Sequence, residues 1–499
     1  MYTRLLYNAK SNSCSRPGLP GLTWFVMLAA IFILAGCGGG DSESDAVSGE
    51  VVISLTDAEG DFATYTVDVS SIKLTRADGT EVETLPLVTR VDFAEYTDVS
   101  EFLTAATVPN GRYVKGSMVL DYTNADIRVE DANGDAQPAA EIVDTNGDPV
   151  GKLKVNVILE GRNVLPVAPG IPKNLLLDFD LEQSNSVLFA GSDVTVTVAP
   201  VLIAEVDPQM PKEHRVRGSL QSVNVAENRF RLFVRPFFHT IRSGPRRFGS
   251  LAVHTGDETF YEIDGISYQG APGLTVLDTL PTFAAVVARG DLRFNPLRFE
   301  AREVYAGSSV PGGALDVVRG SVVERTSDDT IIVKGATLIR QNGAVVFNDL
   351  VTVQLDPSTT VTRQLSMGTF SIDDISVGQR VVVFGTVTND AVSDLQFSAA
   401  NGYARMRLST LRGTVAALPD TQSWLTLNLA SINNRSIELY NFVGTGADTA
   451  SDADPNFYEI DSGSLALEGI GMADSVAVAG FPTAFGSAPA DFTAQTVAK

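Results

Sequence analysis

The chain has 499 residues, and at roughly 150 residues per domain this length indicates about three or four domains. It contains 37 Lys and Arg against 60 Asp and Glu, which gives a formal net charge of −23. Nucleic-acid affinity depends on basic side chains that neutralise phosphates, so this composition excludes a general nucleic-acid binder. Only three His are present, and the usual catalytic bases and zinc ligands are therefore scarce.

The first element in chain order is an uncharged apolar run from Leu22 to Ala35, which follows three basic residues. The run is too short to span a bilayer, and with its basic flank it predicts a secretory signal peptide over residues 1–36. It ends in Leu-Ala-Gly-Cys at Cys37, which resembles the lipobox of bacterial lipoproteins. The resemblance implies that the Cys37 thiol is acylated, with palmitate among the chains, and becomes the new N-terminus. The alternatives are an ordinary signal peptide or a short buried helix.

Cleavage before Cys37 would remove Cys14 and leave one acylated cysteine, so stability would come from packed cores rather than disulfides. By analogy with the lipoprotein sorting rule, Gly38 rather than Asp after the Cys favours the outer membrane if the cell is Gram-negative, with the protein periplasmic or surface-exposed. Residues 37–49 are small, polar and acidic, which predicts a flexible tether.

From Val51 onward, apolar and polar residues alternate, as in strands with one buried face. Tyr65, Val67 and Val69 show the pattern, which returns in residues 153–157 and 194–198. Turn-forming pairs stand at Asp78-Gly79, Asn110-Gly111, Asn133-Gly134 and Asn146-Gly147. Only Ser100–Ala106 is predicted to be helical, so the mature chain is expected to be nearly all β.

Three strings in the predicted first domain, residues 50–207, carry a family resemblance: Ser54–Ala58, Val108–Tyr113 and Leu177–Ser184. Together they resemble domain-of-unknown-function family 4382, which occurs near the start of many bacterial and archaeal lipoproteins. The resemblance implies a β-sandwich and no established activity. Glu59 stands where the family has Pro, which implies a less rigid turn after the first strand.

Beyond residue 210 the sequence repeats three times. Each unit opens in Arg-Gly, has a glycine before its last strands and closes in Phe-x-Ala. The opening glycines are Gly218, Gly320 and Gly413, the inner glycines are Gly290, Gly385 and Gly480, and the closing phenylalanines are Phe299, Phe397 and Phe492. The string Tyr-Glu-Ile-Asp at 261–264 also returns at 458–461.

The apolar run Val381–Phe384 needs cover on both faces, which a closed barrel or tight sandwich supplies. We therefore predict three modules, over residues 212–307, 317–404 and 410–499. They resemble domain-of-unknown-function family 5666, small β-barrel modules found in tandem in secreted bacterial proteins, a family that supplies no activity. The predicted fold is all-β: an N-terminal β-sandwich followed by three small β-barrel or sandwich repeats.

Two loops place oxygen-bearing side chains at alternate positions, as a Ca²⁺ loop does. The candidate ligands are Asp131, Asn133 and Asp135 in the first loop, and Asp144, Asn146 and Asp148 in the second. Both loops lack the glycine and the glutamate at the sixth and twelfth positions of a calcium loop, and Asn-Gly is itself a strong hairpin signal. We therefore favour hairpin turns, keep Ca²⁺ as the alternative and predict no other cofactor.

Residues 212–247 oppose the overall charge, with nine basic side chains against two glutamates. In the predicted strand 229–235, alternation places Arg229, Arg231 and Arg235 on one face with Phe233. Guanidinium groups beside an aromatic ring suit an anionic glycan, a lipid phosphate or an acidic partner. The alternative is that this face docks on the acidic neighbouring domains or is solvated.

The sequence lacks the motifs of nucleophilic catalysis, zinc hydrolysis and nucleotide binding. We expect a lipid-anchored cell-envelope protein that is not an enzyme and has a binding or structural role. Its expected partners are the membrane and a polysaccharide or an envelope protein, and not nucleic acid. One alternative is an envelope carbohydrate hydrolase that uses carboxylates of the first domain, which a pocket holding two Asp or Glu about 5 to 9 Å apart would favour. The other is a passive spacer or assembly scaffold. Convergence of Asp57, Asp178 and Asp180 on a wet cleft would favour metal or sugar binding.

Overall fold

The computed structural model describes residues 47–57, 62–96, 99–191, 193–208, 212–235, 248–293, 298–327, 329–391, 394–419 and 424–499. The predicted signal peptide, the predicted acylation site Cys37 and most of the predicted tether lie outside the described residues. Among the helices of the described part, none is long and apolar enough to cross a membrane.

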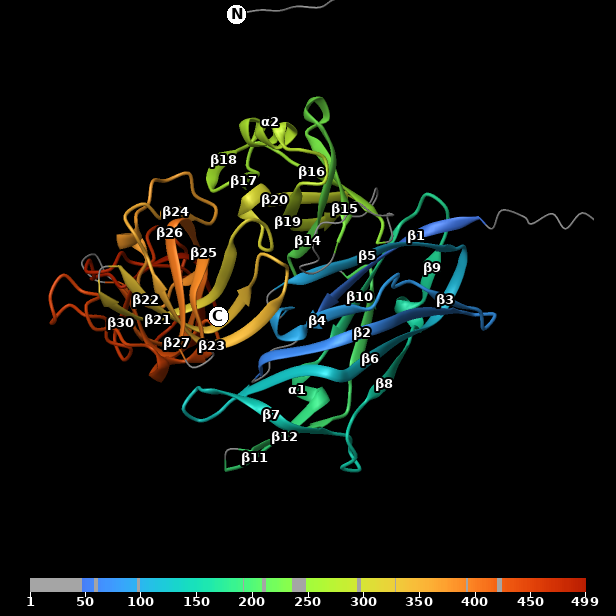
Figure 1. The fold of residues 1–499 in the computed structure, drawn as a ribbon, viewed down its shortest axis with the longest axis horizontal. Coiled ribbons are helices and arrows are strands. Elements are labelled where there is room, and N and C mark those ends of the chain that lie inside the picture. Colours follow the sequence, from blue (N-terminus) through green and yellow to red (C-terminus); the bar gives the residue numbers. More distant parts are fainter. Residues whose placement is uncertain are drawn as a thin grey trace, which may run out of the picture. The chain divides into compact units, whose positions relative to one another are not determined.

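The first domain is the predicted β-sandwich (Figure 1). Its strands are β1 (Ser48–Thr56), β2 (Phe62–Arg76), β3 (Glu81–Glu83), β4 (Thr89–Asp92), β5 (Ser100–Pro109), β6 (Gly111–Glu130), β7 (Ala136–Val143), β8 (Lys152–Ile158), β9 (Leu165–Val167), β10 (Lys173–Phe179), β11 (Asn185–Ala190), β12 (Asp193–Val198) and β13 (Leu202–Val206), with the short helix α1 (Leu181–Ser184) and the 3-10 turns η1 (Phe93–Tyr96) and η2 (Gly161–Asn163). One sheet has the order β13-β10-β1-β5, and the other has β11-β12-β7-β6-β2-β3. Tyr65, Val67 and Val69 on β2 are fully buried between the sheets, as the alternation predicts.

The helix predicted over Ser100–Ala106 is wrong, because this segment is part of β5. Residues 100–104 are all buried, so no alternation marks the segment as a strand. Its hydrogen-bond partners, β1 on one side and β14 (His214–Asn224) on the other, come from distant parts of the chain. Tertiary pairing therefore overrides local propensity here.

The three modules are built from consecutive strands. Module 1 contains β14 (His214–Asn224), η3 (Val225–Glu227), β15 (Arg229–Val234), β16 (Ser250–His254), β17 (Phe260–Ile263), β18 (Ile266–Gln269), α2 (Ala271–Thr279), β19 (Ala285–Arg293), β20 (Arg298–Ala306) and η4 (Gly307–Ser309). Module 2 contains β21 (Asp316–Ser327), β22 (Thr330–Ile339), β23 (Val345–Gln354), β24 (Thr360–Arg363), η5 (Ile372–Asp374), β25 (Arg380–Ala391) and β26 (Asp394–Arg407). Module 3 contains β27 (Ser409–Ala417), β28 (Leu425–Ile432), β29 (Arg435–Ser436), η6 (Ile437–Leu439), β30 (Tyr458–Asp461), β31 (Ser475–Pro482) and β32 (Phe492–Ala498).

Each module closes on itself as a small barrel with the same pairing scheme. In module 2, the sheet runs β21-β22-β23-β26-β25 and returns to β21, with β23 and β26 parallel. Module 1 repeats this ring as β14-β15-β16-β20-β19, and module 3 as β27-β28-β30-β32-β31. The Tyr-Glu-Ile-Asp echo does not mark equivalent strands: Ile460 of β30 pairs with Phe492, whereas Phe299 pairs with Val253 of β16.

The recurring glycines sit where the barrel strands bulge and two backbones approach closely. The register shifts at Gly290 and Gly480 and beside Gly385. A Cβ built on Gly385 would lie 2.0 Å from the carbonyl oxygen of Ser398, and the other two inner glycines meet a carbonyl at 2.0 and 2.1 Å. The repeat is thus the sequence signature of a barrel bend that only glycine fits.

We predict that Gly385→Ala lowers the free energy of unfolding by about 1 to 3 kcal/mol, because the methyl group forces the two strands apart. Denaturant unfolding followed by circular dichroism measures the change. Gly151→Ala is the matched control, since open space surrounds a Cβ at that position. Equal stability of the two variants would contradict the steric account.

The outer face of the Val381–Phe384 run is also covered. Val381 and Val383 belong to the core of module 2. Val382 and Phe384 point the other way, and the Phe384 ring stacks on Tyr403 with centroids 4.1 Å apart. The Tyr403 hydroxyl bonds to the carbonyl oxygen of Ser308 in module 1, so a neighbouring module supplies part of the cover.

Candidate functional site

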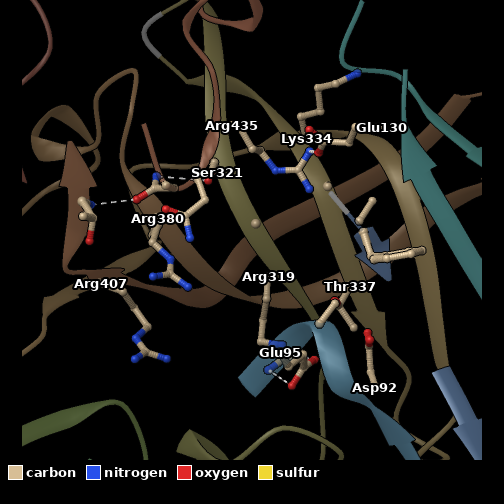
Figure 2. Close-up of a pocket in the computed structure, with 18 of the residues that line it drawn as sticks. Asp92, Glu95, Glu130, Arg319, Ser321, Lys334, Thr337, Arg380, Arg407 and Arg435 are labelled. Carbon is tan, nitrogen blue, oxygen red and sulfur yellow. Dashed lines mark hydrogen bonds and ion pairs between the residues drawn. The ribbon is translucent and has the colours of Figure 1, made fainter. Parts of the chain in front are cut away.

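A cleft of about 600 Å³ lies where the first domain meets modules 2 and 3, with two module 1 residues also in its lining (Figure 2). This volume is in the range of small-molecule sites, about 300 to 1,000 Å³. Its described lining includes seven cationic and four acidic side chains, the reverse of the balance in the whole chain. The cations are Arg215, Arg289, Arg319, Lys334, Arg380, Arg407 and Arg435, and the acids are Asp92, Glu95, Glu130 and Asp131.

One wall of the cleft is the outer face of module 2. Arg380 of β25 lies directly opposite Arg407 of β26 and also opposite Ser321 of β21. Arg319 precedes Ser321 by two residues, so strand alternation places it on the same face. In Figure 2 the Arg380 and Arg407 side chains extend toward the same part of the pocket. Like charges directly opposite each other repel, so the pair concentrates positive charge on this wall of the cleft.

A second wall belongs to the first domain and carries two interacting carboxylates. Glu95 in η1 forms an ion pair with Arg319, and its Oε2 lies 3.7 Å from nitrogens of both Arg215 and Arg217. Burial alone would raise the pKa of Glu95, but these three guanidinium groups lower it to about 2.

Asp92, at the end of β4, behaves in the opposite way. Its carboxylate accepts hydrogen bonds from the Tyr65 backbone N–H at 2.8 Å and from the Thr64 hydroxyl at 2.9 Å. Burial, and then the negative charge of Glu95, raise the pKa of Asp92 to about 7. The positive charge of the cleft therefore increases as the solution becomes mildly acidic.

The third wall forms where the 131–135 turn meets modules 2 and 3. Lys334 Nζ lies 2.9 Å from Asp135 Oδ1 and 3.1 Å from Asp349 Oδ2. Arg435 of module 3 forms an ion pair with Glu130 at the end of β6. These contacts hold the turn between the first domain's strands and the two modules.

Both candidate calcium loops are the favoured hairpin turns. Asp131 Oδ1 accepts the backbone N–H groups of Asn133 and Asp135, at 2.8 and 3.0 Å. Asp144 makes the same pair of bonds to Asn146 and Asp148 in the second loop. The first aspartate of each loop thus accepts hydrogen bonds from the backbone of its own loop. Among the described residues, no group of three or more His, Cys, Asp or Glu is arranged to hold a metal ion.

The sequence-predicted basic strand is β15, and it lies outside the described lining of the cleft. Arg229 pairs with Glu227, Arg231 Nη2 donates to Ser250 Oγ at 3.3 Å, and Arg235 Nη1 donates to the carbonyl of Val234 at 2.9 Å. Phe233 is only 6 % exposed, and its ring stacks on that of Phe283 with centroids 5.9 Å apart.

Two other basic residues of the same region, Arg215 and Arg217 of β14, contact the first domain. Glu101 of β5 is 0 % exposed and receives Arg215 Nε at 2.5 Å and Arg217 Nε at 2.9 Å.

The three first-domain carboxylates considered for metal or sugar binding have local structural roles or lie apart from the cleft. Asp180 caps α1 by accepting the Gln183 N–H at 2.9 Å. Asp57 accepts the Leu181 N–H at 3.1 Å. Burial raises the pKa of Asp178, and none of the three belongs to the described cleft lining.

Sequence reasoning missed the cleft because its residues come from all four parts of the chain. One signal was available: the Arg-Gly pair that opens each repeat. The opening arginines Arg217 and Arg319 both reach Glu95, so they serve more than the barrel fold.

Residues 48–193 match the model of the family described as "Domain of unknown function (DUF4382)". The match agrees with the resemblance found in three strings of the first domain and covers less than a third of the chain. No curated protein and no solved structure matches the chain. The family description assigns no activity, so the cleft itself has to carry any functional argument.

Proposed function

We propose that this protein binds an acidic glycan in the cleft between its first domain and modules 2 and 3. The observation that carries the proposal is the Arg380–Arg407 pair, two like charges held directly opposite each other beside Arg319. Each guanidinium offers a planar fork of donors that matches a carboxylate, sulfate or phosphate. An anionic group placed between them could accept hydrogen bonds from both guanidinium groups.

The rest of the lining suits the hydroxyl groups of a sugar. Ser321, Thr410 and Asn434 supply neutral donors and acceptors, and Glu130 and Asp131 can accept hydrogen bonds from hydroxyls. A ligand that combines a negative group with hydroxyls would thus use both kinds of wall.

We further propose the setting in which this binding occurs. Acylation of Cys37 would anchor the protein in the cell envelope at the outer membrane, and the three barrels would be modules of the family-5666 type. The supports are the lipobox-like sequence, the Gly38 that follows it and the shared Arg-Gly and Phe-x-Ala pattern. The role proposed is binding rather than catalysis.

Retention on polygalacturonate, an anionic polyuronate, tests the ligand class. We expect the full-length protein to be retained by polygalacturonate in affinity electrophoresis and not by neutral dextran. Arg380→Ser combined with Arg407→Ser should weaken retention at least tenfold, because a hydrogen bond to a charged group contributes about 1.5 to 3 kcal/mol.

Arg229→Ser combined with Arg231→Ser is the matched control, because it removes the same charge from β15, away from the described cleft lining. It should leave retention unchanged. If the cleft variant were retained as strongly as the natural protein, the proposal would be wrong. If only the control variant lost retention, binding would be assigned to the β15 arginines. If neither polymer retained the natural protein, the result would favour the alternative that the protein is a passive spacer.

A further inference from the structure

Three large apolar side chains are exposed at one end of the first domain. Val47, Ile158 and Ile171 are 55, 70 and 54 % exposed. Scattered apolar residues are common on protein surfaces, so these three carry an argument only if they are close together and something specific covers them.

Backbone contacts place Val47 and Ile171 at the end of the sandwich where β1 begins, and Ile158 lies four positions along β6 from the first residue of that strand. Figure 1 shows where β1 begins. The Val47 carbonyl accepts the Asn110 N–H at 2.9 Å, next to the start of β6. The Ile171 N–H bonds to Ala168, just after β9, which itself pairs with the start of β6. Ile158 is the last residue of β8 and lies opposite Lys115 of β6.

Basic side chains accompany this apolar end. Arg112 of β6 is exposed, and Lys115 is the cross-strand neighbour of Ile158. The Arg162 side chain is 80 % exposed, and its nearest acid is Glu205 at 3.6 Å. Exposed apolar residues with arginine and lysine among them form the combination that an anionic lipid surface attracts.

The length of chain before the domain sets how far this end can lie from a membrane. Ten residue steps separate Cys37 from Val47, and a chain of that length reaches at most about 36 Å even when fully extended. If Cys37 is acylated, the end of the domain that carries Val47 is therefore held within this distance of the bilayer.

We propose that the end of the first domain formed by Val47, Ile158 and Ile171 rests on an anionic lipid bilayer. The two isoleucines insert among the lipid headgroups and upper acyl chains, and Arg112 and Lys115 contact lipid phosphates. This inference rests on the acylation of Cys37 proposed above. The surface would contact the same membrane to which the chain is anchored, so the contact needs no partner protein.

Single-cysteine labelling tests the contact in the acylated mature protein. Because cleavage removes Cys14 and acylation blocks Cys37, an introduced cysteine is the only free thiol. Ile158→Cys and Ile171→Cys carry an environment-sensitive NBD dye in vesicles of phosphatidylethanolamine and phosphatidylglycerol. We expect blue-shifted emission, severalfold brighter than in water and quenched by brominated acyl chains.

Val443→Cys in module 3 is the matched control, because Val443 is 68 % exposed. Its dye should emit as in water. Labels at 158 and 171 that behave like the label at 443 would overturn the proposed contact. Vesicle flotation and labelled-palmitate incorporation separate the two failures: an anchored protein with water-exposed labels refutes only this contact, whereas a protein that neither floats nor takes up palmitate refutes the anchor as well.

Discussion

Replacement of Glu262 by alanine is expected to lower the free energy of unfolding by about 3 to 5 kcal/mol, because it leaves a buried guanidinium without its anion. Glu262 of module 1 is 1 % exposed and binds Arg405 of module 2 through two oxygens, at 2.5 and 2.8 Å. The Thr362 hydroxyl donates to the same carboxylate at 2.8 Å. Burial alone would lower the pKa of Arg405, but the Glu262 charge more than offsets this and raises it.

Glu81→Ala is the matched control for this prediction. Its partner Lys73 lies at 3.1 Å, but both side chains are more than a third exposed, and such surface pairs contribute about 1 kcal/mol or less. Differential scanning calorimetry of the full chain measures both variants. A thermal shift for Glu262→Ala no larger than that for Glu81→Ala would show that the junction between modules 1 and 2 does not depend on this pair.

Glu95→Gln is expected to lower the free energy of unfolding by about 3 kcal/mol at neutral pH. This is the stabilisation that corresponds to a pKa lowered from 4.5 to about 2 on folding. The folded state holds this carboxylate ionised more strongly than the unfolded state does. The stabilisation is therefore complete above about pH 4.5 and is lost as the pH falls toward 2. The stability difference between the natural protein and the variant, measured by urea unfolding at several pH values, should shrink over that interval.

For Asp92→Asn, the stability difference between variant and natural protein should change with pH in the opposite direction. This variant is therefore a control for general effects of acid. The pKa of Asp92 rises from 3.8 to about 7 in the folded protein, so its ionisation opposes folding as the pH increases through that range. The variant should therefore become more stable relative to the natural protein between pH 4 and 7. Two parallel profiles would contradict the assignment of separate roles to the two carboxylates.

The repeated part of the fold could be predicted because its constraints are local in sequence. Gly290, Gly385 and Gly480 each meet a carbonyl oxygen across a bulge, and this steric demand recurs at the same place in every barrel. The strand at Ser100 could not be predicted, because burial on both faces removes the alternation on which such predictions depend. Helix α2 was also missed: its Pro272 suits a first helical turn, but Gly273 is present because the Tyr261 ring leaves no room for a Cβ.

The cleft could not be predicted because it depends on register and on docking. Arg380 and Arg407 are separated by 26 intervening residues and become neighbours only through the pairing of β25 with β26. Charge density along the chain pointed instead to β15, where the arginines are close in sequence and Phe233 is buried. A high density of basic residues along the sequence therefore did not reveal the cleft, where basic residues distant in sequence come together.

The pairing of β5 with β14 joins the sandwich to the first barrel in one continuous sheet. The Ser100 N–H bonds to the carbonyl of Glu213 at 2.8 Å, and the Ala105 N–H bonds to that of Phe248 at 2.9 Å. A fragment truncated at residue 207 would retain every family-matched residue. It would, however, expose the unpaired edge of β5 and leave the buried Glu101 carboxylate without the arginines that bind it. Such a fragment should self-associate, and during synthesis this edge of the sandwich can be completed only after the chain through Phe248 has been made.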